Sequence, residues 1–442
     1  MGGGLAGSEA AFQAAERGVE VVLYEMRPGT MTGAHTTGFL AELVCSNSLG
    51  SRLPDRATGL LMHELDLLDS LLVKIALEVS VPAGGALAVD REGFSQRVTE
   101  AIERHPCIQI KREEVTTIPE GPCILATGPL TSDALAANIA ARTGEDNLYF
   151  YDALAPIVTS DSIDMSIAFR ASRYDKGDLE EGDYINCPLN EEQYNSFVNA
   201  LLTAERIPLR PFEQDIENGT MKAGKGFFEG CLPIEVLASR GIRSLAYGPM
   251  RPVGLDDPRT GRWPHAVLQL RQDDAAGSLY NLVGFQTNLT FPEQRRVFRM
   301  IPGLEQAEFV RFGQMHRNTF LNAPGLLDKT LVWRDTPVLF VAGQLSGVEG
   351  YMGNIGTGWV AGVNAAAMIQ GKDPVIMPSE TMLGSLLRYI TESGEMTFQP
   401  MKANFGLMVP FEDGVKRNKK VRAQAYAQRS LRMLESSTYQ CA

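Results

Sequence analysis

The sequence predicts an α/β fold of the Rossmann type: a discontinuous dinucleotide-binding domain, its first strand apparently missing, with a second α/β domain inserted into it. Three observations lead to this prediction. A glycine-rich motif near the N-terminus precedes an alanine-rich helix and a β-branched strand. Two later segments, far apart in the chain, look like buried strands that end in glycine turns. The stretch between them has charge-rich loops and short strands of its own. We place the first domain at residues 1–165 and 300–442, and the inserted domain at residues 166–299.

The N-terminal motif places Gly2, Gly4 and Gly7 in the spacing GxGxxG. The alanine-rich stretch that follows predicts a helix. Residues 19–24 form a short segment rich in β-branched side chains, which predicts a strand. Glu25 stands at the end of this strand. A glycine motif, helix, strand and acidic residue in this order are typical of a site that binds a dinucleotide.

Each part of this unit has a physical role in dinucleotide binding. The first glycine permits a tight turn, the second lets the backbone approach a pyrophosphate, and the third lets the helix pack closely on the sheet. The helix N-terminus offers unpaired N–H groups to the phosphates, and the acidic residue accepts hydrogen bonds from a ribose hydroxyl. A glycine-rich turn without a special role is the alternative. The candidate cofactor-binding residues here are Gly2, Gly3, Gly4, Leu5, Ala6, Gly7 and Glu25.

The buried strand that should precede the motif is missing, because only Met1 stands before the glycines. This strand belongs in the middle of a parallel sheet, where its absence costs most. Either the sequence begins after it, or another segment fills its place. We favour the first explanation, and therefore expect the chain as written to hold its dinucleotide weakly.

Two later segments add to the same site. Residues 123–129 have the pattern of a buried strand followed by a turn at Gly128, and a second such segment ends at Gly343. In open α/β sheets these strand ends lie at one edge, where ligands bind, so both glycines are candidate cofactor contacts. The second segment leads into a glycine-rich loop that contains Tyr351, another candidate, and then into an alanine-rich helix predicted from Val360. An ordinary strand–loop–helix junction is the alternative for either segment alone.

The composition limits the class of protein. The 442 residues include 41 basic and 53 acidic side chains, for a net charge of −12. This excludes a uniformly basic protein that coats nucleic acid, but not one with a local basic face. Six cysteines without a CxxC pair indicate neither a disulfide scaffold nor a zinc site. No apolar run reaches the roughly 18 residues that span a bilayer, and no signal peptide is evident. We expect a cytoplasmic protein with no membrane partner and no metal.

Basic residues are concentrated near the C-terminus, where residues 415–432 contain no acid. The composition of this segment allows a helix. Such a helix could contact phosphate groups, whose neutralisation dominates affinity for nucleic acids. A solvated helix face is an equally weighted alternative. The basic residues of the segment are Lys416, Arg417, Lys419, Lys420, Arg422, Arg429 and Arg432.

Two cysteines stand in distinctive surroundings. Cys45 follows a short apolar run and precedes small polar residues, which predicts a loop or a helix start beside the nucleotide. Cys231 lies just before Pro233, and proline is typical of the first turn of a helix. A helix N-terminus favours a thiolate. For an arbitrary cysteine, the role of a small buried side chain is commoner. We assign this structural role to Cys107, Cys123, Cys187 and Cys441.

Several segments together resemble the TrmFO family, the folate- and FAD-dependent tRNA (uracil-5-)-methyltransferases. The similarity covers essentially the whole chain in order, although residues 352–355 depart from the pattern of many members. The matching segments are residues 2–11, 42–50, 81–91, 228–233, 248–254, 283–287, 315–318, 347–351 and 398–401.

The resemblance implies that the first domain binds FAD and that the protein methylates carbon 5 of the uridine at position 54 in the tRNA T loop. It implies 5,10-methylenetetrahydrofolate as the one-carbon donor and NAD(P)H as the reductant. By matching positions, Cys231 attacks carbon 6 of the uracil and Cys45 assists removal of the proton from carbon 5. Arg271, His316 and Arg317 are candidates to hold folate carboxylates or phosphates, with ordinary ion pairs as the alternative.

General chemistry agrees with this reaction. Carbon 5 of uracil is a poor nucleophile until a thiolate adds at carbon 6, and it must later lose its proton to a base. A uridine stacked in a folded loop must be extruded to be reached. Tyr351 could stack on a ring, or could be a core aromatic.

Three other functions stay open from the sequence. The first is a flavoprotein of the related MnmG family, which modifies the wobble uridine of tRNA. The second is an FAD oxidoreductase of small molecules, and the third is an inactive tRNA-binding protein. An assay for 5-methyluridine in the T loop would separate these functions from the one that the resemblance implies.

Overall fold

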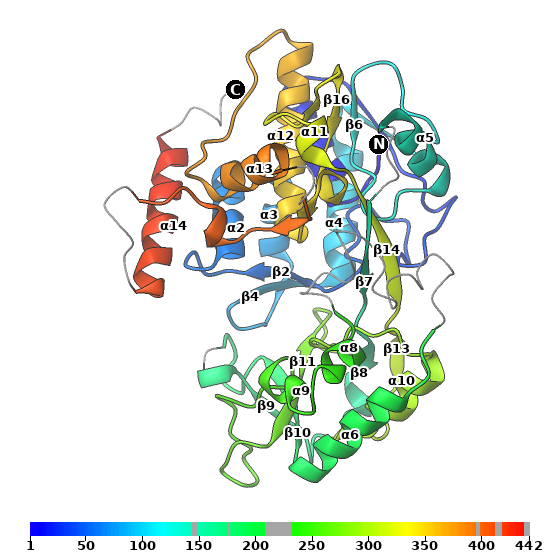
Figure 1. The fold of residues 1–442 in the computed structure, drawn as a ribbon, viewed down its shortest axis with the longest axis vertical. Helices are drawn as coiled ribbons and strands as arrows, with labels where there is room; N and C mark the ends of the chain where they lie inside the picture. The colour runs from blue at the N-terminus through cyan, green and yellow to red at the C-terminus, as the bar shows by residue number, and fades with distance from the viewer. Residues whose placement is uncertain (144–147, 176, 208–231, 395–397, 412–417, 437–442) are drawn as a thin grey trace.

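The computed structural model describes residues 1–143, 148–175, 177–207, 232–394, 398–411 and 418–436. Figure 1 shows two units, one above the other along the long axis of the molecule. The larger unit combines segments from both ends of the chain, and the smaller one comes from the middle, coloured green. The predicted α/β class, with one unit inserted into another, is confirmed.

The larger unit is built from the following elements. Its helices are α1 (Leu5–Glu16), α2 (Ala57–Leu67), α3 (Leu71–Glu78), α4 (Arg91–Arg104), α5 (Asp133–Thr143), α11 (Ala323–Leu326), α12 (Tyr351–Ile369), α13 (Met382–Glu392) and α14 (Lys419–Glu435). Its strands are β1 (Val21–Tyr24), β2 (Ser48–Ser51), β3 (Ser80–Val81), β4 (Ala86–Val89), β5 (Ile108–Lys111), β6 (Cys123–Leu125), β15 (Val332–Trp333), β16 (Thr336–Val341), β17 (Val348–Glu349) and β18 (Met401–Lys402).

Short parallel strands from distant parts of the sequence meet in this unit. β1 pairs in parallel with β5, and β6 pairs in parallel with β16. β16 also pairs antiparallel with β15. Because β6 and β16 come from opposite sides of the inserted unit in the sequence, both chain ends build the predicted nucleotide-binding unit.

The first two residues lie between β1 and β6. The Met1 nitrogen donates to the carbonyl of Ile124 (2.9 Å), and the Met1 carbonyl accepts from the N–H of Ala126 (2.9 Å). The N–H of Gly2 donates to the carbonyl of Tyr24 (2.8 Å). These bonds join the two strand pairs at the place predicted for the missing strand, and no strand among the described residues lies there. They also place the start of α1 at the carboxyl ends of β1 and β6.

Helices α1 and α12 pack with their backbones in contact. A Cβ atom on Gly358 would lie 2.3 Å from the carbonyl oxygen of Ala6, and one on Gly362 would lie 2.5 Å from that of Ala10. Glycine at these two positions therefore permits the close approach. The predicted start of this helix at Val360 is wrong, because α12 begins at its first glycines rather than after them.

The smaller, inserted unit has a six-stranded antiparallel sheet in the order β13-β8-β12-β11-β10-β9. Alternate residues of β11, such as Leu268 and Leu270, enter its hydrophobic core, while Gln269 and Arg271 point to the other face. The strands are β8 (Ile157–Thr159), β9 (Phe169–Ala171), β10 (Tyr184–Leu189), β11 (Ala266–Gln272), β12 (Leu279–Leu282) and β13 (Phe309–Arg311). The helices are α6 (Glu191–Thr203), α8 (Ile234–Ser239), α9 (Ser244–Tyr247) and α10 (Phe291–Phe298).

The sheet of the inserted unit includes strands from outside the predicted range 166–299. β8 precedes that range and β13 follows it, yet both pair within the six-stranded sheet. We therefore propose to count both strands with the inserted unit. β7 (Leu148–Ala153) and β14 (Met315–Phe320) pair with each other and run between the two units in Figure 1.

Among the described residues, every helix is too short or too polar to span a bilayer. Within the same residues, no three His, Cys, Asp or Glu side chains gather closely enough to hold a metal ion. The absence of a metal in the working protein stays a prediction.

Candidate active site

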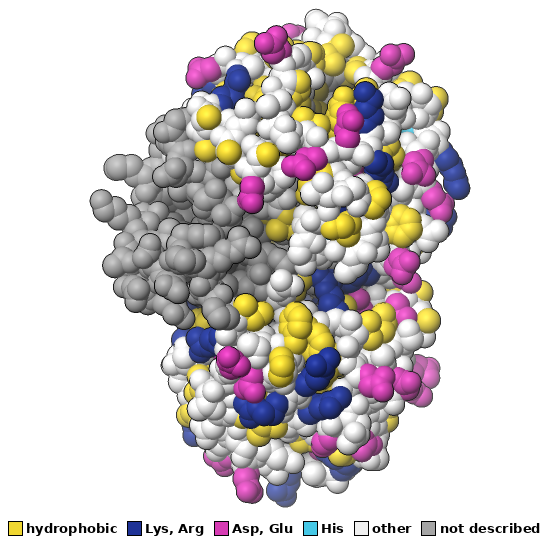
Figure 2. Space-filling view, turned by 90° about the vertical axis from the view of Figure 1, so that its right-hand side faces the viewer, with side chains coloured by type: hydrophobic (Ala, Val, Ile, Leu, Met, Phe, Trp, Pro, Cys, Tyr) yellow, Lys and Arg dark blue, Asp and Glu magenta, His cyan; other side chains and the backbone are white. Residues whose placement is uncertain are grey.

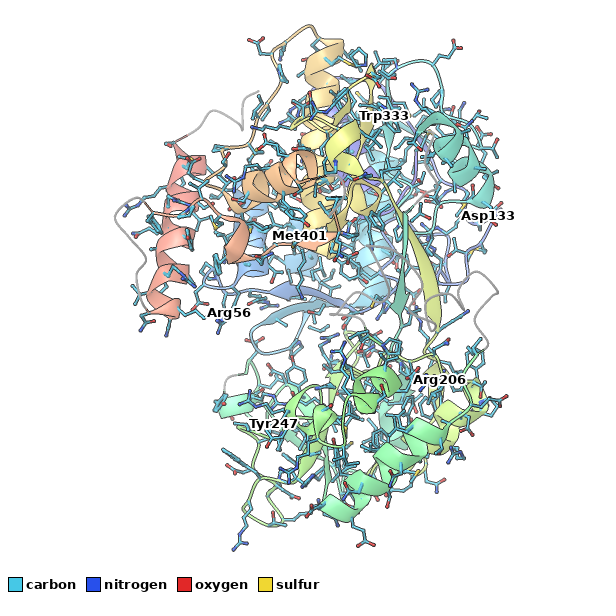
Figure 3. The ribbon with its side chains drawn as sticks, viewed as in Figure 1. Arg56, Asp133, Arg206, Tyr247, Trp333 and Met401 are labelled. Carbon is cyan, nitrogen blue, oxygen red and sulfur yellow. The ribbon has the colours of Figure 1, made fainter. Side chains whose placement is uncertain are left out.

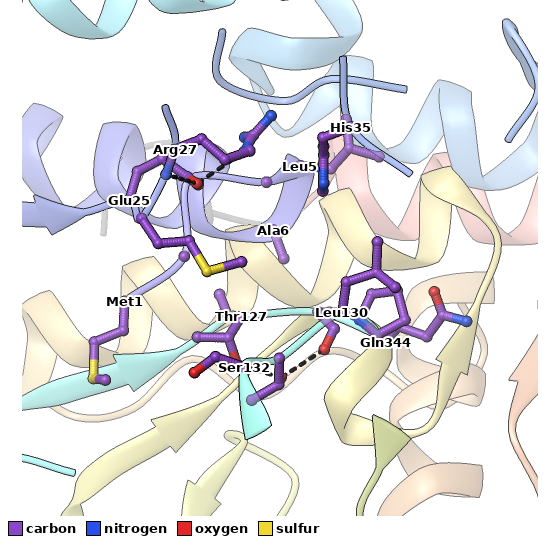
Figure 4. Close-up of a pocket in the computed structure, with 18 of the residues that line it drawn as sticks. Met1, Leu5, Ala6, Glu25, Arg27, His35, Thr127, Leu130, Ser132 and Gln344 are labelled. Atoms are coloured by element: carbon purple, nitrogen blue, oxygen red, sulfur yellow. Dashed lines mark hydrogen bonds and ion pairs between the residues drawn. The ribbon is translucent and has the colours of Figure 1, made fainter. Parts of the chain in front are cut away.

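A cleft with about 1000 Å³ of empty space opens where β1 and β6 end and α1 begins. Figure 4 shows Glu25 and Arg27 on one side of it, Leu5 and Ala6 near the centre, and Gln344 on the opposite side. The predicted cofactor-binding residues that line this cleft are Gly2, Gly4, Leu5, Ala6, Glu25, Gly128, Gly343 and Tyr351.

The glycines of the N-terminal motif set the shape of the cleft. Gly2 has a φ of +89°, and a Cβ atom there would lie 2.5 Å from the carbonyl oxygen of Ala126. A Cβ on Gly7 would lie 1.7 Å from the carbonyl oxygen of Gly2, so only glycine lets the helix approach the turn. A Cβ on Gly4 would meet no atom within 4 Å. The first N–H groups of α1, which have no partners inside the helix, are therefore open to an anionic ligand.

Glu25 lies buried at the end of β1 and is held by backbone and side-chain donors. Its Oε2 accepts from the N–H of Gly3 (2.8 Å), and its Oε1 accepts from Nε of Arg27 (2.8 Å). Arg27 also donates to Glu42 (3.1 Å). Burial alone would raise the pKa of Glu25, but the hydrogen bonds and charge of Arg27 hold it below its ordinary value. The ionised carboxylate has acceptor capacity left for a ligand hydroxyl.

The opposite wall comes from the turns after β6 and β16. Gly128 and Gly343 both have positive φ angles, +70° and +74°. Thr131 donates to the carbonyl of Gly128 (2.9 Å), and the N–H of Gly343 donates to Thr357 (2.9 Å). A Cβ on Gly343 would lie 2.9 Å from the Cβ of Ala6, so this turn packs directly on α1.

Tyr351 connects the cleft to the Cys45 loop, by which we mean residues 43–47. Its hydroxyl accepts hydrogen bonds from the backbone N–H groups of Cys45 (3.0 Å) and Ser46 (3.2 Å). Burial raises the pKa of Tyr351, so the hydroxyl stays protonated at neutral pH. Cys45 is half-buried and forms no disulfide. The sequence allows either a loop or a helix start at Cys45, and the structure shows a loop.

Arg91, the first residue of α4, reaches the Cys45 loop from the larger unit. Its guanidinium donates to the carbonyl oxygens of Leu43 and Cys45. It also forms a two-point ion pair with Asp273 of the inserted unit (3.0 and 2.9 Å). Burial would lower the pKa of Arg91, but the charge of Asp273 raises it above its ordinary value. This arginine therefore links the loop to both units.

Two more arginines reach the loop from the inserted unit. Arg271, on β11, donates to Oγ of Ser46 (2.5 Å) and to Oδ1 of Asn47 (2.9 Å). Arg311, at the end of β13, donates to the carbonyl of Val44. Burial lowers the pKa of both guanidinium groups, yet they stay cationic at neutral pH. The loop is thus held by cations from both units, in surroundings that suit an anionic ligand.

Some predicted residues are not placed by the structure. Cys231 falls outside the described residues, and so do Lys416 and Arg417. The side chains of His316 and Arg317 are also outside the description. The candidate nucleophile therefore stays a prediction.

The cysteines assigned a structural role differ in their burial. Burial raises the pKa values of Cys123 and Cys187, which makes both thiols poor nucleophiles at neutral pH. Cys107 is half-buried, and Cys441 lies outside the described residues.

Sequence reasoning missed several residues of this site. Arg27 had a usable signal, because it follows Glu25 by two positions and can fold back on that carboxylate. Glu42 and Arg91 stand in two of the segments that carry the family resemblance, 42–50 and 81–91, but the sequence did not indicate their contacts or those of Arg311. Their partners lie far away in the sequence or in an irregular loop.

The chain is similar to known proteins along nearly its whole length. The family model described as "Glucose inhibited division protein A" (GIDA) matches residues 1–373. The methylenetetrahydrofolate--tRNA-(uracil-5-)-methyltransferase TrmFO of Bacillus cereus is 54% identical, covering 99% of this chain and 97% of its own. The protein of the same name from Bacillus licheniformis is 55% identical with the same coverage. A solved structure of Aquifex aeolicus GidA shares the fold, with a TM-score of 0.66 at 16% identity, over 99% of this chain and 73% of that one.

Proposed function

The chain belongs to the TrmFO family, and on that premise we propose that it is an FAD- and methylenetetrahydrofolate-dependent tRNA (uracil-5-)-methyltransferase. The resemblance found in the sequence is thereby confirmed. The reaction places a methyl group on carbon 5 of the uridine at position 54 of the T loop. The one-carbon unit comes from 5,10-methylenetetrahydrofolate and the reducing equivalents from NAD(P)H.

The residues of the cleft fit a dinucleotide such as FAD. The space beside Gly4 leads to the N-terminus of α1, where a pyrophosphate would accept backbone N–H groups. Glu25 would accept a hydrogen bond from a ribose hydroxyl, while Gly128 and Gly343 add no side chains of their own to the opposite wall. Bound FAD would accept reducing equivalents and relay the one-carbon unit. The weak retention of the flavin predicted from the sequence stays a prediction.

The two candidate cysteines would supply the steps that the nucleotide does not. In the proposal, the Cys231 thiolate adds to carbon 6 of the uracil and makes carbon 5 nucleophilic. Carbon 5 would then bond to the one-carbon unit that originates from methylenetetrahydrofolate, and Cys45 would assist transfer of the carbon 5 proton to a base. A hydride equivalent that originates from NAD(P)H would complete the methyl group. Elimination of the Cys231 thiolate would restore the double bond between carbons 5 and 6 and release the methylated base.

One observation, more than any other, supports a reaction site beside the Cys45 loop. Tyr351 lines the dinucleotide cleft, and its hydroxyl accepts a hydrogen bond from the backbone of Cys45. The Cys45 loop therefore lies directly beside the end of the cleft. A uracil brought to this loop would be next to the group that delivers the carbon.

The test is methylation of a defined tRNA by the full chain. A transcript with uridine at position 54 is incubated with methylenetetrahydrofolate, FAD and NADPH, and 5-methyluridine is measured by mass spectrometry of nucleosides. Product should require folate and should not require S-adenosylmethionine. Absence of product at position 54, or modification of the wobble uridine instead, would contradict the proposal.

Cysteine variants test the residue roles in the same assay. Cys231→Ala should abolish the product, and Cys45→Ala should lower its rate strongly. Cys107→Ala is the matched control, because Cys107 is also half-buried but lies away from the cleft. An undiminished rate in Cys231→Ala would remove its assignment as the nucleophile.

A further inference from the structure

The inserted unit exposes two tyrosines beside a group of arginines. Tyr247 is 75% exposed and Tyr174 is 61% exposed. Tyr174 follows β9, and its N–H donates to the carbonyl of Gly254 (3.0 Å), which brings it to the segment that carries Tyr247. We call this surface the tyrosine–arginine ridge. It consists of Arg173, Tyr174, Arg243, Tyr247 and Arg251.

Tyr174 is held in a conformation that non-glycine residues seldom adopt. Its φ and ψ are 58° and 31°, in the left-handed region. A Cβ atom on Gly254 would lie 3.0 Å from the Tyr174 ring, so the ring rests against this glycine backbone. The fold thus fixes an exposed aromatic ring at a cost in backbone energy. Such local strain is concentrated at binding sites.

The five residues of the ridge include three arginines and no acid, in a protein of net charge −12. Residues 236–255 contain three arginines and no acidic residue. Arg173 donates to the carbonyl oxygens of Val253 and Arg251 (both 2.7 Å), which holds two guanidinium-bearing residues together. Burial, and then the charge of Arg251, lower the pKa of Arg173. An anion bound between them would relieve this repulsion.

The ridge continues into the candidate active site through one strand. Arg173 also donates to Gln269 on β11 (2.9 Å). Arg271, about 7 Å further along the same strand, holds Ser46 and Asn47 of the Cys45 loop. The ridge and the Cys45 loop are therefore joined through neighbouring side chains of β11.

Tyr247 is the ridge residue that the figures label. In Figure 3, Tyr247 lies on the inserted unit opposite Arg206 and on the same side as Arg56. Figure 1 shows the basic helix α14 on that side too. The face in Figure 2, the right-hand side of Figure 1, mixes Lys and Arg with Asp and Glu.

We propose that the tyrosine–arginine ridge binds an unpaired segment of the tRNA substrate, with bases stacked on Tyr174 and Tyr247 and phosphates at Arg243 and Arg251. Stacking on aromatic rings accepts any base, and arginines neutralise the phosphates. Exposed rings alternating with arginines are the pattern of such a surface. The inference rests on the proposed function, because it assumes that tRNA is the substrate.

The test measures affinity of the full chain for a tRNA transcript by fluorescence anisotropy. Tyr174→Ala and Tyr247→Ala should each weaken binding by about tenfold, since each removes a stacking platform. Tyr174→Phe should bind like the unchanged protein, because it keeps the ring. Arg251→Gln should reduce the slope of log affinity against log salt by about 1.

Matched controls separate the ridge from general surface effects. Phe291→Ala removes an aromatic ring, 43% exposed, from α10 of the inserted unit. Arg104→Gln removes an exposed arginine from α4 of the larger unit. Both should leave tRNA affinity unchanged. Thermal unfolding and NADPH oxidation without tRNA should be the same in all variants.

Every other outcome contradicts either the proposed function or this inference. If the unchanged protein forms no 5-methyluridine, the proposed function fails. If it forms the product but the ridge variants bind tRNA normally, this inference alone is overturned. Equal loss in Tyr174→Phe and Tyr174→Ala, or equal loss in Phe291→Ala, would also overturn it. So would ridge variants that change the sedimentation of the protein and not its tRNA affinity, because they would indicate a protein contact.

Discussion

The hydroxyl of Tyr351 accepts two consecutive backbone N–H groups, those of Cys45 and Ser46. Because Tyr351 also lines the cleft, this one side chain fixes the distance between the Cys45 loop and any ring bound there. An amide left without an acceptor in a buried place costs about 1–3 kcal/mol. Loss of the hydroxyl alone should therefore destabilise the Cys45 loop.

Replacement of Tyr351 by Phe should loosen the Cys45 loop while keeping the aromatic wall of the cleft. We expect faster alkylation of Cys45 by iodoacetamide, a lower kcat, and little change in flavin content. Peptide mass spectrometry with time measures the alkylation. Tyr389→Phe is the control, since the Tyr389 hydroxyl donates to the carbonyl of Gln399, outside the site. Unchanged alkylation and kcat would show that the hydroxyl does not hold the loop.

Single residues differed in how far the sequence could predict them. Glu25 was predictable because its role depends on a strand end that follows the glycine motif by local spacing. The arginines around Cys45 were not, because each reaches the loop from an element distant in the sequence, and arginine is common on surfaces. The sequence suggested that Arg271 binds a folate carboxylate or a phosphate, or forms an ion pair. In the structure, Arg271 donates hydrogen bonds to Ser46 and Asn47.

At the scale of helices, Glu64 of α2 joins three elements. Its carboxylate accepts from the N–H groups of Met382 (2.6 Å) and Leu383 (2.8 Å) at the start of α13. It also accepts from the hydroxyl of Ser430 on α14. Burial raises the pKa of Glu64 from 4.5 to about 7, although these hydrogen bonds oppose the shift.

This raised pKa predicts a pH dependence of stability. The folded protein binds the Glu64 proton more tightly than the unfolded chain, so the stability from protonation is complete below pH 4.5 and is lost as the pH rises toward about 7. Glu64→Gln should remove this loss. Thermal unfolding from pH 5 to 8 should show the unchanged protein losing stability relative to the variant. The exposed Glu103→Gln should run parallel to the unchanged protein, and a constant difference for Glu64→Gln would contradict the prediction.

Helix α14 contains the predicted basic segment from Lys419 onward, but not all of its cationic side chains face solvent. Lys419 and Lys420 are exposed in its first turn. Arg429 instead lies over the rings of Phe411 (4.6 Å) and Tyr426 (5.2 Å). Fewer bases are therefore available for phosphate than the sequence count suggests.

The tRNA footprint predicted for α14 can be tested by charge removal. Lys419, Lys420 and Arg422 changed together to Gln should weaken tRNA binding, and should flatten its salt dependence by about 2 to 3 in slope. Anisotropy titrations at several salt concentrations measure both. Arg104→Gln again serves as the surface control. Unchanged affinity at low salt would exclude this helix from the footprint.

Helix α12 shows why element boundaries were harder to predict than elements. Its glycines have low helix propensity, so the sequence favoured a loop before Val360. Their real role is tertiary, because Gly358 and Gly362 let α12 touch α1. Only the position of the second helix could reveal this.

For the whole molecule, the Arg91–Asp273 ion pair is one of several polar contacts between the units. The two side chains are 14% and 3% exposed, so the pair is largely out of water. Removing one partner of such a pair costs about 3–5 kcal/mol, whereas replacing both by apolar groups costs much less. We therefore expect the ion pair to fix the orientation of the two units and to add little net stability.

A double-mutant cycle tests this expectation. Arg91→Met and Asp273→Leu should each lower the free energy of unfolding by about 3–5 kcal/mol, and the double variant by clearly less than their sum. Denaturant titrations measure all three. Methylation should fall in each variant, because Arg91 also binds the Cys45 loop. Additive losses would show that the two side chains act independently.

The sequence correctly predicted that one unit is inserted into another, because the glycine turns after β6 and β16 indicate strands that end at the same edge of a sheet. It did not predict where the inserted unit begins and ends. β8 and β13 are short, and they join the six-stranded sheet by pairing with segments distant in the sequence: β8 pairs with β12, and β13 pairs with β8. Such pairing leaves no local pattern in either segment.

The hydrogen bond between Tyr351 and the backbone of Cys45 spans 306 residues of chain. At about 5–20 residues per second, a ribosome needs roughly 15–60 s to make that length after Cys45 has been added. During that time the acceptor for these amides does not yet exist. The order of synthesis therefore makes the Cys45 loop one of the last parts of the protein to reach its working form.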